Sequence, residues 1–372
     1  AGAAQNNCRQ WISCFDYDNG TLTQRYRVSY GQINLNEYSD QKWAVVQFAD
    51  FDEDGTPELF IGNHVMNAIT GAIIASPTVA QRNSWPRGRL PGGSYGDYMS
   101  AAYDVLPDAA CATCNGLELI CGNTVYAVDL SNPTNNQNGI TVATQMTPTG
   151  TYTDGLTSLA DWDGDGEMDI IVTGFAGGTA NFYIWNPRAD TVIIDRTNIP
   201  NGGDGAGRAS IADFDGDGNN ELAIVSKNRL HLYETDGSIK WTLNSIDNSS
   251  KTSATAFDFE GDGNMEVVYR DEQNLRILDG VTGNVKDILG CVSGTRVEMP
   301  VVADVDADGE TEICVSCESN TRVYTSDQTP WMPTRKVWNS VHYVPTFIND
   351  DLTIPAQRQP KATTAGKDLY AA

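Results

Sequence analysis

Basic residues are scarce in this chain. Lys and Arg together number 24, against 49 Asp and Glu in 372 residues, and the formal net charge is -25. No stripe of basic side chains is present to release counterions from phosphates, so we expect neither nucleic acid nor an anionic membrane surface as a partner. Long apolar runs are also lacking. Because no stretch of about 18 apolar residues occurs, no membrane span is expected.

Sequence motifs for catalysis are equally sparse. The chain has three histidines, and no nucleophile elbow, P-loop or zincin motif is present. His231 alternates with Leu230 and Leu232, which is typical of a histidine packed in a strand. Catalysis needs a convergent acid, base or nucleophile. We therefore predict that the chain is not an enzyme.

Cysteine is present in an even number, eight, which favours disulfides in an oxidising compartment. The spacing of Cys111 and Cys114 lacks a second such pair or a nearby His, so a zinc site is not expected. The pairing cannot be derived from the sequence, and three local options stand open: Cys8 with Cys14, Cys111 with Cys114, and Cys314 with Cys317.

Acidic residues are abundant and follow a repeated pattern. Five loops, starting at residues 50, 161, 213, 258 and 304, carry acids at positions one, three, five and nine and a Gly at position six. The acids are Asp50, Asp52, Asp54 and Glu58; Asp161, Asp163, Asp165 and Asp169; Asp213, Asp215, Asp217 and Glu221; Asp258, Glu260, Asp262 and Glu266; and Asp304, Asp306, Asp308 and Glu312.

Carboxylates at alternate positions converge on one centre, and hard oxygen ligands of this kind suit Ca²⁺. The glycine is expected to take a positive φ in a tight turn. The helix-flanked calcium loop closes at position twelve, whereas these loops close at nine. Short runs rich in β-branched residues follow them, so we expect strand, calcium loop, strand, with about five ions. Glu260 stands where the other loops have Asp, which makes this the least regular of the five sites.

The spacing of the loops predicts a repeat architecture. The first interval is about twice the others, so a degenerate copy is expected near residue 110; in residues 115–129 the strand after the loop survives, but the aspartates do not. A Cys111–Cys114 disulfide is one hypothesis for how this turn is held; free or differently paired cysteines are the other.

Outer hairpins follow the inner strands, and one more lies at residues 11–28. Seven hairpins with a four-stranded repeat of about 50 residues predict an all-β fold, a β-propeller of seven blades with four-stranded antiparallel sheets. Residues 29–47 and the segment after 338 are candidates to help the hairpin close the ring. Arg322–Tyr324 is expected to form the last outer hairpin with the chain near Val337. We assign 1–345 to the propeller and 346–372 to a tail or linker.

The loops and their flanking strands resemble FG-GAP or VCBS repeats, the calcium-binding blades of integrin-type propellers, over about residues 40–340. The resemblance implies a backbone carbonyl ligand from the seventh residue of each loop: Thr56, Glu167, Asn219, Asn264 and Glu310.

Residues 337–355 are similar to a segment that follows propeller repeats in large surface proteins of gliding bacteria exported by type IX secretion. This second resemblance implies one module of a longer adhesin-like protein, located at the cell surface or outside the cell, with a protein or glycan as partner. We therefore expect a non-catalytic, calcium-stabilised surface scaffold or adhesion module.

The alternative is a carbohydrate-active propeller, either a polysaccharide lyase or a lectin-like glycan binder. Its ligand site would lie in the long insertion between residues 77 and 110. The candidate residues there are Trp85, Arg87, Arg89, Tyr95 and Tyr98.

Overall fold

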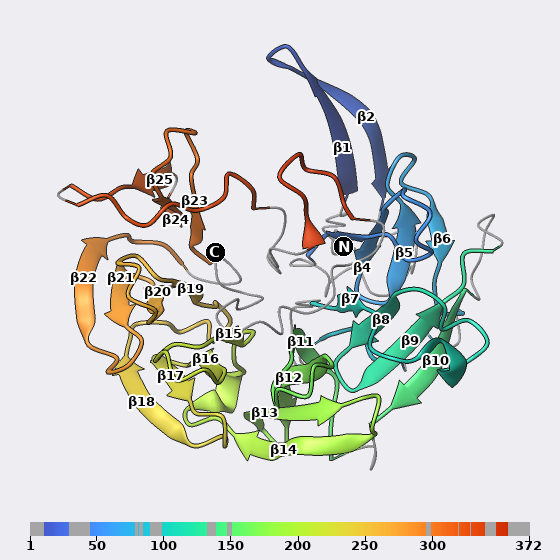
Figure 1. Ribbon diagram of the computed structural model, residues 1–372, viewed down its shortest axis with the longest axis horizontal. Coiled ribbons are helices and arrows are strands. Elements are labelled where there is room, and N and C mark those ends of the chain that lie inside the picture. Colours follow the sequence, from blue (N-terminus) through green and yellow to red (C-terminus); the bar gives the residue numbers. More distant parts are fainter. Residues whose placement is uncertain are drawn as a thin grey trace, which may run out of the picture.

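The computed structural model describes residues 11–29, 45–78, 81, 85–89, 99–131, 139–146, 151–294, 299–318, 320–327, 329–338 and 347–355. Among these residues, the chain forms seven antiparallel sheets, of which five have four strands, one has three and one has two (Figure 1). All of the sheets except the two-stranded β1–β2 sheet are arranged around a centre, with first strands such as β11 and β15 innermost and β14, β18 and β22 at the rim. The predicted all-β propeller with seven sheets is confirmed.

We number six of the sheets as blades in chain order. Blade 1 holds β3 (Gln47–Ala49), β4 (Glu58–Ile61), β5 (His64–Asn67) and β6 (Ile73–Ala75). Blade 2 holds β7 (Ala101–Tyr103), β8 (Glu118–Cys121), β9 (Thr124–Val128) and β10 (Ile140–Gln145), with the short 3-10 helix η2 (Asp108–Ala110) before β8. Blade 3 holds β11 (Gly155–Ala160), β12 (Asp169–Ala176), β13 (Thr179–Asn186) and β14 (Thr191–Asn198), followed by η3 (Gly202–Asp204).

The remaining sheets are built from the C-terminal half and the N-terminal hairpin. Blade 4 holds β15 (Ser210–Ala212), β16 (Glu221–Ser226), β17 (Arg229–Tyr233) and β18 (Ile239–Asn244). Blade 5 holds β19 (Thr255–Phe257), β20 (Glu266–Arg270), β21 (Asn274–Asp279) and β22 (Val285–Gly290). Blade 6 holds β23 (Val301–Ala303), β24 (Glu312–Cys317) and β25 (Asn320–Tyr324). The hairpin joins β1 (Trp11–Asp18) to β2 (Thr21–Ser29).

Hydrophobic packing follows from the position of each strand. Every residue of the second strand β16 is buried, whereas the rim strand β18 is exposed or half-buried along its length. The buried cores lie between neighbouring blades: one joins blades 2 and 3, another blades 3 and 4, and another blades 4 and 5. A sheet buried on both faces explains the continuous apolar runs that follow each acidic loop.

Neighbouring blades are also joined by side-chain hydroxyls on the innermost strands. Each hydroxyl belongs to a first strand and donates to a backbone carbonyl in or just before the first strand of the next blade. The bonds are Ser158 to Ala209 (3.0 Å), Ser210 to Ala254 (2.6 Å) and Thr255 to Pro300 (2.7 Å). These buried polar groups therefore stabilise the order of the blades around the centre.

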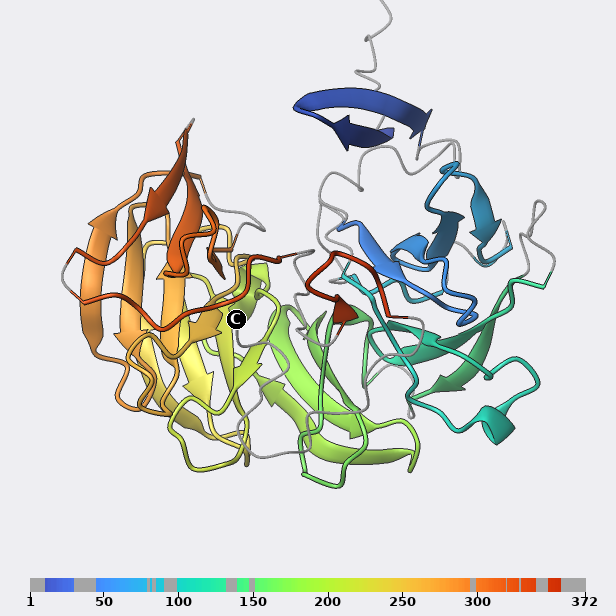
Figure 2. The same cartoon turned by 45° about the horizontal axis from the view of Figure 1, so that its top comes forward.

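The N-terminal hairpin lies beside blade 1, outside the ring of blades (Figure 2). The Tyr26 hydroxyl donates to the Ala68 carbonyl at 2.9 Å, and Ile12 packs with Leu59 and Met66. Of the segments proposed to close the ring, residues 29–47 and the chain after 338, most residues lie outside the described part (30–44, 339–346 and 356–372), so this part of the expectation stays a prediction.

Two features of the C-terminal region differ from expectation or extend it. The last hairpin, between Arg322–Tyr324 and Val337, is not formed: among the described residues, the sheet of blade 6 ends at β25. Instead, residues 329–338 run across the loops of blades 5 and 6, where the Met332 N–H donates to the Phe259 carbonyl. Phe347, in the segment expected to be a tail, stacks on Tyr103 of blade 2 with ring centroids 5.6 Å apart. None of the described helices is long and apolar enough to cross a membrane.

Candidate metal centres

The five acidic loops share one backbone geometry. Each joins the first strand of a blade to the second, as the register pair of Ala212 with Glu221 shows for blade 4. The glycine at position six has a positive φ in all five loops, between 86° and 95°, as its pattern predicts. The first aspartate accepts the N–H of that glycine; in blade 4 the Gly218 N–H lies 2.9 Å from Asp213 Oδ2. The loops are thus preorganised around their first carboxylate.

The ninth acid ties each loop to its own beginning. One of its carboxylate oxygens accepts the backbone N–H of the second loop residue in all five copies. The pairs are Phe51 with Glu58, Trp162 with Asp169, Phe214 with Glu221, Phe259 with Glu266 and Val305 with Glu312, at 2.7–3.0 Å. Because the ninth acid opens the second strand, this bond fixes the acid at the base of the loop.

The other oxygen of the ninth acid decides whether a cation fits. Asp169 and Glu221 have no measurable exposure, and Asp169 Oδ1 and Glu221 Oε1 have no hydrogen-bond partner. Asp161 Oδ1 and Asp304 Oδ1 are likewise buried without a partner. A buried carboxylate oxygen without a partner is costly, and a bound cation would satisfy it. The donor set therefore fits a metal ion.

Four of the five loops bring their acids close enough to share one ion. Within the described part of the chain, the groups whose ligand oxygens all lie within 4.8 Å of one another are Asp50, Asp52 and Glu58; Asp161, Asp163 and Asp169; Asp213, Asp215 and Glu221; and Asp304, Asp306 and Asp308. The loop at residue 258 does not form such a group, although all of its residues are described.

Burial and mutual repulsion set the electrostatics of these loops. Burial raises the pKa of Glu58 and of Glu221 to about 8, and the neighbouring loop aspartates add to the shift. Burial likewise raises the pKa of Asp169 to about 7. A cation at the loop centre would offset both causes, because it pairs with the charged form of each acid.

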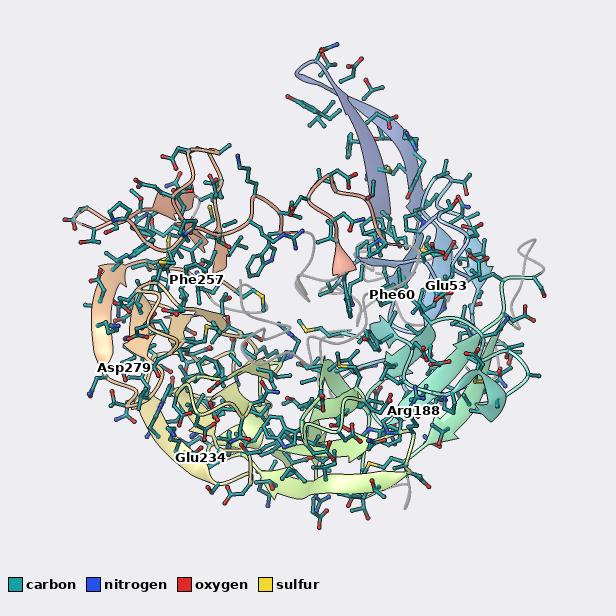
Figure 3. The ribbon with its side chains drawn as sticks, in the orientation of Figure 1. Glu53, Phe60, Arg188, Glu234, Phe257 and Asp279 are labelled. Atoms are coloured by element: carbon teal, nitrogen blue, oxygen red, sulfur yellow. A yellow bond between two sulfur atoms is a disulfide. The ribbon has the colours of Figure 1, made fainter. Side chains whose placement is uncertain are left out.

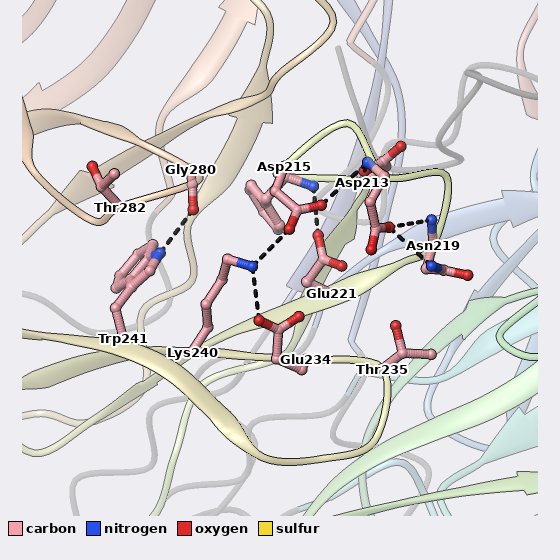
Figure 4. A network of polar contacts seen from close by, with 12 residues as sticks. Asp213, Asp215, Asn219, Glu221, Glu234, Thr235, Lys240, Trp241, Gly280 and Thr282 are labelled. Atoms are coloured by element: carbon pink, nitrogen blue, oxygen red, sulfur yellow. Dashed lines mark hydrogen bonds and ion pairs between the residues drawn. The ribbon is translucent and has the colours of Figure 1, made fainter.

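Blade 4 shows the arrangement most completely (Figure 4). The Lys240 ammonium group lies 2.6 Å from Asp215 Oδ2 and 2.7 Å from Glu234 Oε1, at the outer side of the loop. It does not reach Glu221, whose Oε1 stays without a partner. The Trp241 indole N–H donates to the Gly280 carbonyl of blade 5 at 2.7 Å. Strand β18 thus contacts the acidic loop of its own blade through Lys240 and is hydrogen-bonded to blade 5 through Trp241.

Blade 2 closes the equivalent turn without a group of three acids within 4.8 Å of one another, although residues 101–118 are all described. Of the two alternatives for Cys111 and Cys114, the structure has the disulfide, with the Cα atoms 5.2 Å apart. The expectation that the loop acids are lost is only partly right. Glu118 Oε2 accepts the N–H groups of Val105 (2.9 Å) and Leu106 (3.1 Å), the contact that the ninth acid makes elsewhere.

Asp104 therefore holds the first position of the blade 2 loop, and the inserted residues between it and Glu118 conceal the pattern in the sequence. Arg188, from the turn after β13, lies between blades 2 and 3 (Figure 3). Its guanidinium group is 3.8 Å from Asp104 and 3.1 Å from Glu167. A protein cation thus stands beside the acids of this loop.

The other cysteine expectations need correction. Cys317 pairs with Cys291, Cα atoms 5.0 Å apart, and Cys314 is a free thiol. The proposed Cys314–Cys317 bond is wrong because both residues lie in β24, where positions three apart point to opposite faces and are too distant to bridge. Cys14 is also a free thiol, and Cys8 lies outside the described residues.

The candidate ligand loop is tied to the propeller body. Trp85 stacks on Tyr126 of blade 2, with ring centroids 5.4 Å apart and an interplanar angle of 19°. Asp154, which the sequence analysis did not single out, accepts the backbone N–H groups of Arg87, Gly88 and Arg89 at 2.8–3.1 Å. One face of the Trp85 indole is therefore used for packing. Tyr95 and Tyr98 lie outside the described residues.

His231 is packed within blade 4, as expected. Its ring nitrogens lie 3.1 Å from Ser226 Oγ and 2.9 Å from Thr242 Oγ1, and burial lowers its pKa. The Ser226 hydroxyl also donates to the Pro200 carbonyl at 2.8 Å. The Ser–His contact therefore holds β16, β17 and β18 together inside the blade.

Comparison with known proteins identifies the repeats. A family profile described as an FG-GAP-like repeat matches residues 161–224 and 213–269, which contain the loops at 161, 213 and 258. This stretch of the chain therefore consists of FG-GAP-like repeats. No curated protein sequence matches the chain.

Solved propeller-like structures are similar at low identity. BamB from Moraxella catarrhalis is 10% identical over 86% of this chain and 76% of its own, with a TM-score of 0.45. The V. cholerae biofilm matrix protein Bap1 is 17% identical over 92% and 73%, with a TM-score of 0.39. A Bacillus licheniformis rhamnogalacturonan lyase is 18% identical over 89% of this chain and 53% of its own, also with a TM-score of 0.39. We draw no function from these similarities.

Proposed function

We propose that this chain is a non-catalytic propeller whose acidic loops bind Ca²⁺, and that it serves as a scaffold or adhesion module at the cell surface. The observation that carries the proposal is the buried, unpartnered oxygen of the ninth acid in blades 3 and 4, Asp169 and Glu221. Each faces a set of loop carboxylates within 4.8 Å. Hard oxygen ligands in an irregular loop favour Ca²⁺ over the smaller Mg²⁺, which demands near-octahedral geometry.

The position of the loops supports a structural role for the ion. Each loop joins the first strand of a blade to the second, so a cation at its centre would hold both strands and the carboxylates that fix their ends. Carboxylates committed to a metal ion are not available as free acid and base. Calcium in this fold would stabilise the blades, and recognition is left to the segments outside the repeats.

The disulfides support a location outside the cell. Cys111–Cys114 and Cys291–Cys317 are both formed, and disulfides persist in oxidising compartments. Calcium sites of modest affinity also fill at the millimolar calcium found there. The resemblance of residues 337–355 adds the prediction of a longer parent protein exported by type IX secretion, with a protein or glycan as its partner.

Removal of calcium tests the proposal directly. Binding to the folded state alone adds RT ln(1 + [L]/Kd) per site, about 2.7 kcal/mol when the ligand exceeds Kd 100-fold. We expect thermal unfolding in EGTA to occur about 10 °C or more below unfolding in millimolar CaCl₂. Addition of MgCl₂ to the chelated protein should restore little of this difference. An unfolding curve that is identical in EGTA and in CaCl₂ would refute the calcium role.

An enzyme assay tests the non-catalytic part. Release of unsaturated sugars from an acidic polysaccharide by the purified chain would replace the scaffold with a polysaccharide lyase. Calcium-dependent stability would be unaffected by that result, so the two parts of the proposal are separable.

A further inference from the structure

We infer that the loop of blade 5, residues 258–266, is closed by the Lys286 ammonium group and takes no divalent cation. The inference deepens the proposed function and rests on it, because it divides the acidic loops into those that bind calcium and one that does not. Four calcium ions per chain are then expected.

The Lys286 ammonium group occupies the place of a cation between the third and ninth loop positions. Its Nζ lies 2.6 Å from Glu260 Oε2 and 2.8 Å from Glu266 Oε1. Glu266 Oε2 accepts the Phe259 N–H at 2.9 Å. Both oxygens of this ninth acid are thus partnered, whereas the ninth acids of blades 3 and 4 each leave one buried oxygen without a partner.

The third loop position explains why the acids of blade 5 do not converge. Glu260 replaces the usual aspartate, and its additional methylene group carries the carboxylate outward to Lys286. The first acid, Asp258, accepts three backbone N–H groups, those of Gly261, Asp262 and Gly263, at 2.6–3.1 Å. Of the five acidic loops, all fully described, this is the one whose acids do not gather within 4.8 Å.

Blade 4 provides a matched comparison. Lys240 and Lys286 are each the second residue of the fourth strand in their blade, β18 and β22. Lys240 divides its bonds between Asp215 and Glu234 and does not reach the ninth acid. In blade 5, the residue that pairs with Glu266 on the neighbouring strand β21 is Asp279. Asp279 Oδ1 accepts the N–H and the hydroxyl of Thr282, so this carboxylate is bound within its own turn. Lys286 therefore pairs with the ninth acid of its own loop, Glu266, whereas Lys240 pairs with Glu234, which lies outside the loop.

Calcium stoichiometry tests this inference. The full chain is dialysed to equilibrium in excess CaCl₂, and bound calcium is counted by elemental analysis. We expect four ions in the wild type. Glu260→Ala in blade 5 should leave four, whereas the matched change Asp215→Ala in blade 4 should leave three, because alanine removes the ligand oxygen of the third position. Asp213 and Asp258 still accept the Asp217 and Asp262 N–H groups at 3.1 Å, so both variants should fold, as a melting curve in CaCl₂ will show.

The lysines provide the reverse experiment. Lys286→Met removes the internal cation, so the count should rise to five, whereas Lys240→Met should leave it at four. Five ions in the wild type, a loss of one ion in Glu260→Ala, or four ions in Lys286→Met would each overturn the inference. No bound calcium in any variant would instead refute the proposed function, so the two failures are distinguishable.

Discussion

Blades 2 and 4 close the same turn by different chemistry. In both blades, a buried glutamate at the start of the second strand, Glu118 or Glu221, accepts a backbone N–H from the beginning of the loop. Blade 4 surrounds its glutamate with aspartates within 4.8 Å. Blade 2 has lengthened the loop, and it is crosslinked by the Cys111–Cys114 disulfide instead.

The comparison separates what the fold needs from what the loop chemistry supplies. The common element is the carboxylate-to-backbone bond, which sets the length of the turn and the register of the first two strands. In the proposed assignment, calcium, a lysine ammonium group or a disulfide then stabilises that turn. A propeller built in this way can lose one metal site without losing a blade.

The largest effect that distinguishes the two blades is expected from Glu221→Gln. The amide oxygen of glutamine can still accept the Phe214 N–H, but the substitution removes the negative charge that the Glu221 carboxylate would present to a cation. In calcium, loss of this site should lower the free energy of unfolding by about 2 to 3 kcal/mol. In EGTA at neutral pH, the same change should stabilise the protein, because burial raises the pKa of Glu221 to about 8 and the glutamine removes the free-energy cost of that shift.

Thermal melts of the wild type and the Glu221→Gln variant, each in CaCl₂ and in EGTA, measure this reversal of sign. A variant that is destabilised equally in both conditions would show that Glu221 acts only through packing. The comparison with blade 2 would then lose its basis.

The repeat unit was predictable because it is local. The acid spacing and the glycine at position six lie within nine consecutive residues. The two cysteines of the Cys111–Cys114 disulfide are likewise close in the sequence, with a separation of 3. Asp104 was missed because inserted residues separate it from Glu118. Only the shared contact with the Val105 N–H reveals that the two belong to one loop.

Long-range features could not be derived from the sequence. Cys291 and Cys317 come together because β24 of blade 6 packs against blade 5, which no local spacing records. Lys286 reaches Glu266 because β22 lies beside the acidic loop of its own blade. Asp154 accepts the Arg87 N–H because the long insertion folds back onto the chain just before β11. In each case the partner is chosen by the tertiary packing of strands distant in the sequence.

A smaller effect is expected from the disulfide of blade 2. Cys111→Ser together with Cys114→Ser removes a short covalent loop, which should lower the free energy of unfolding by about 2 kcal/mol. The loss should be the same in CaCl₂ and in EGTA, because this turn does not use the metal. Chemical denaturation under both conditions measures it. A loss confined to one condition would show that the disulfide and the calcium loops are coupled.

A pH-dependent effect is expected from Glu118→Gln. Burial raises the pKa of Glu118 to about 7. When the pKa of a carboxyl group is raised in the folded state, the protein loses stability as pH rises from the unfolded pKa of that group, about 4.5, to its folded pKa. The glutamine cannot ionise, so the gain of the variant over the wild type should grow by about 1 kcal/mol per pH unit between pH 4.5 and pH 7, level off near pH 8, and shrink toward zero below pH 4.5. Melting temperatures across this range measure the gain, with Glu221→Gln in EGTA as the matched control. A gain that stays constant with pH would show that the pKa of Glu118 is the same in the folded and the unfolded protein, and the raised pKa of this buried carboxyl group would be refuted.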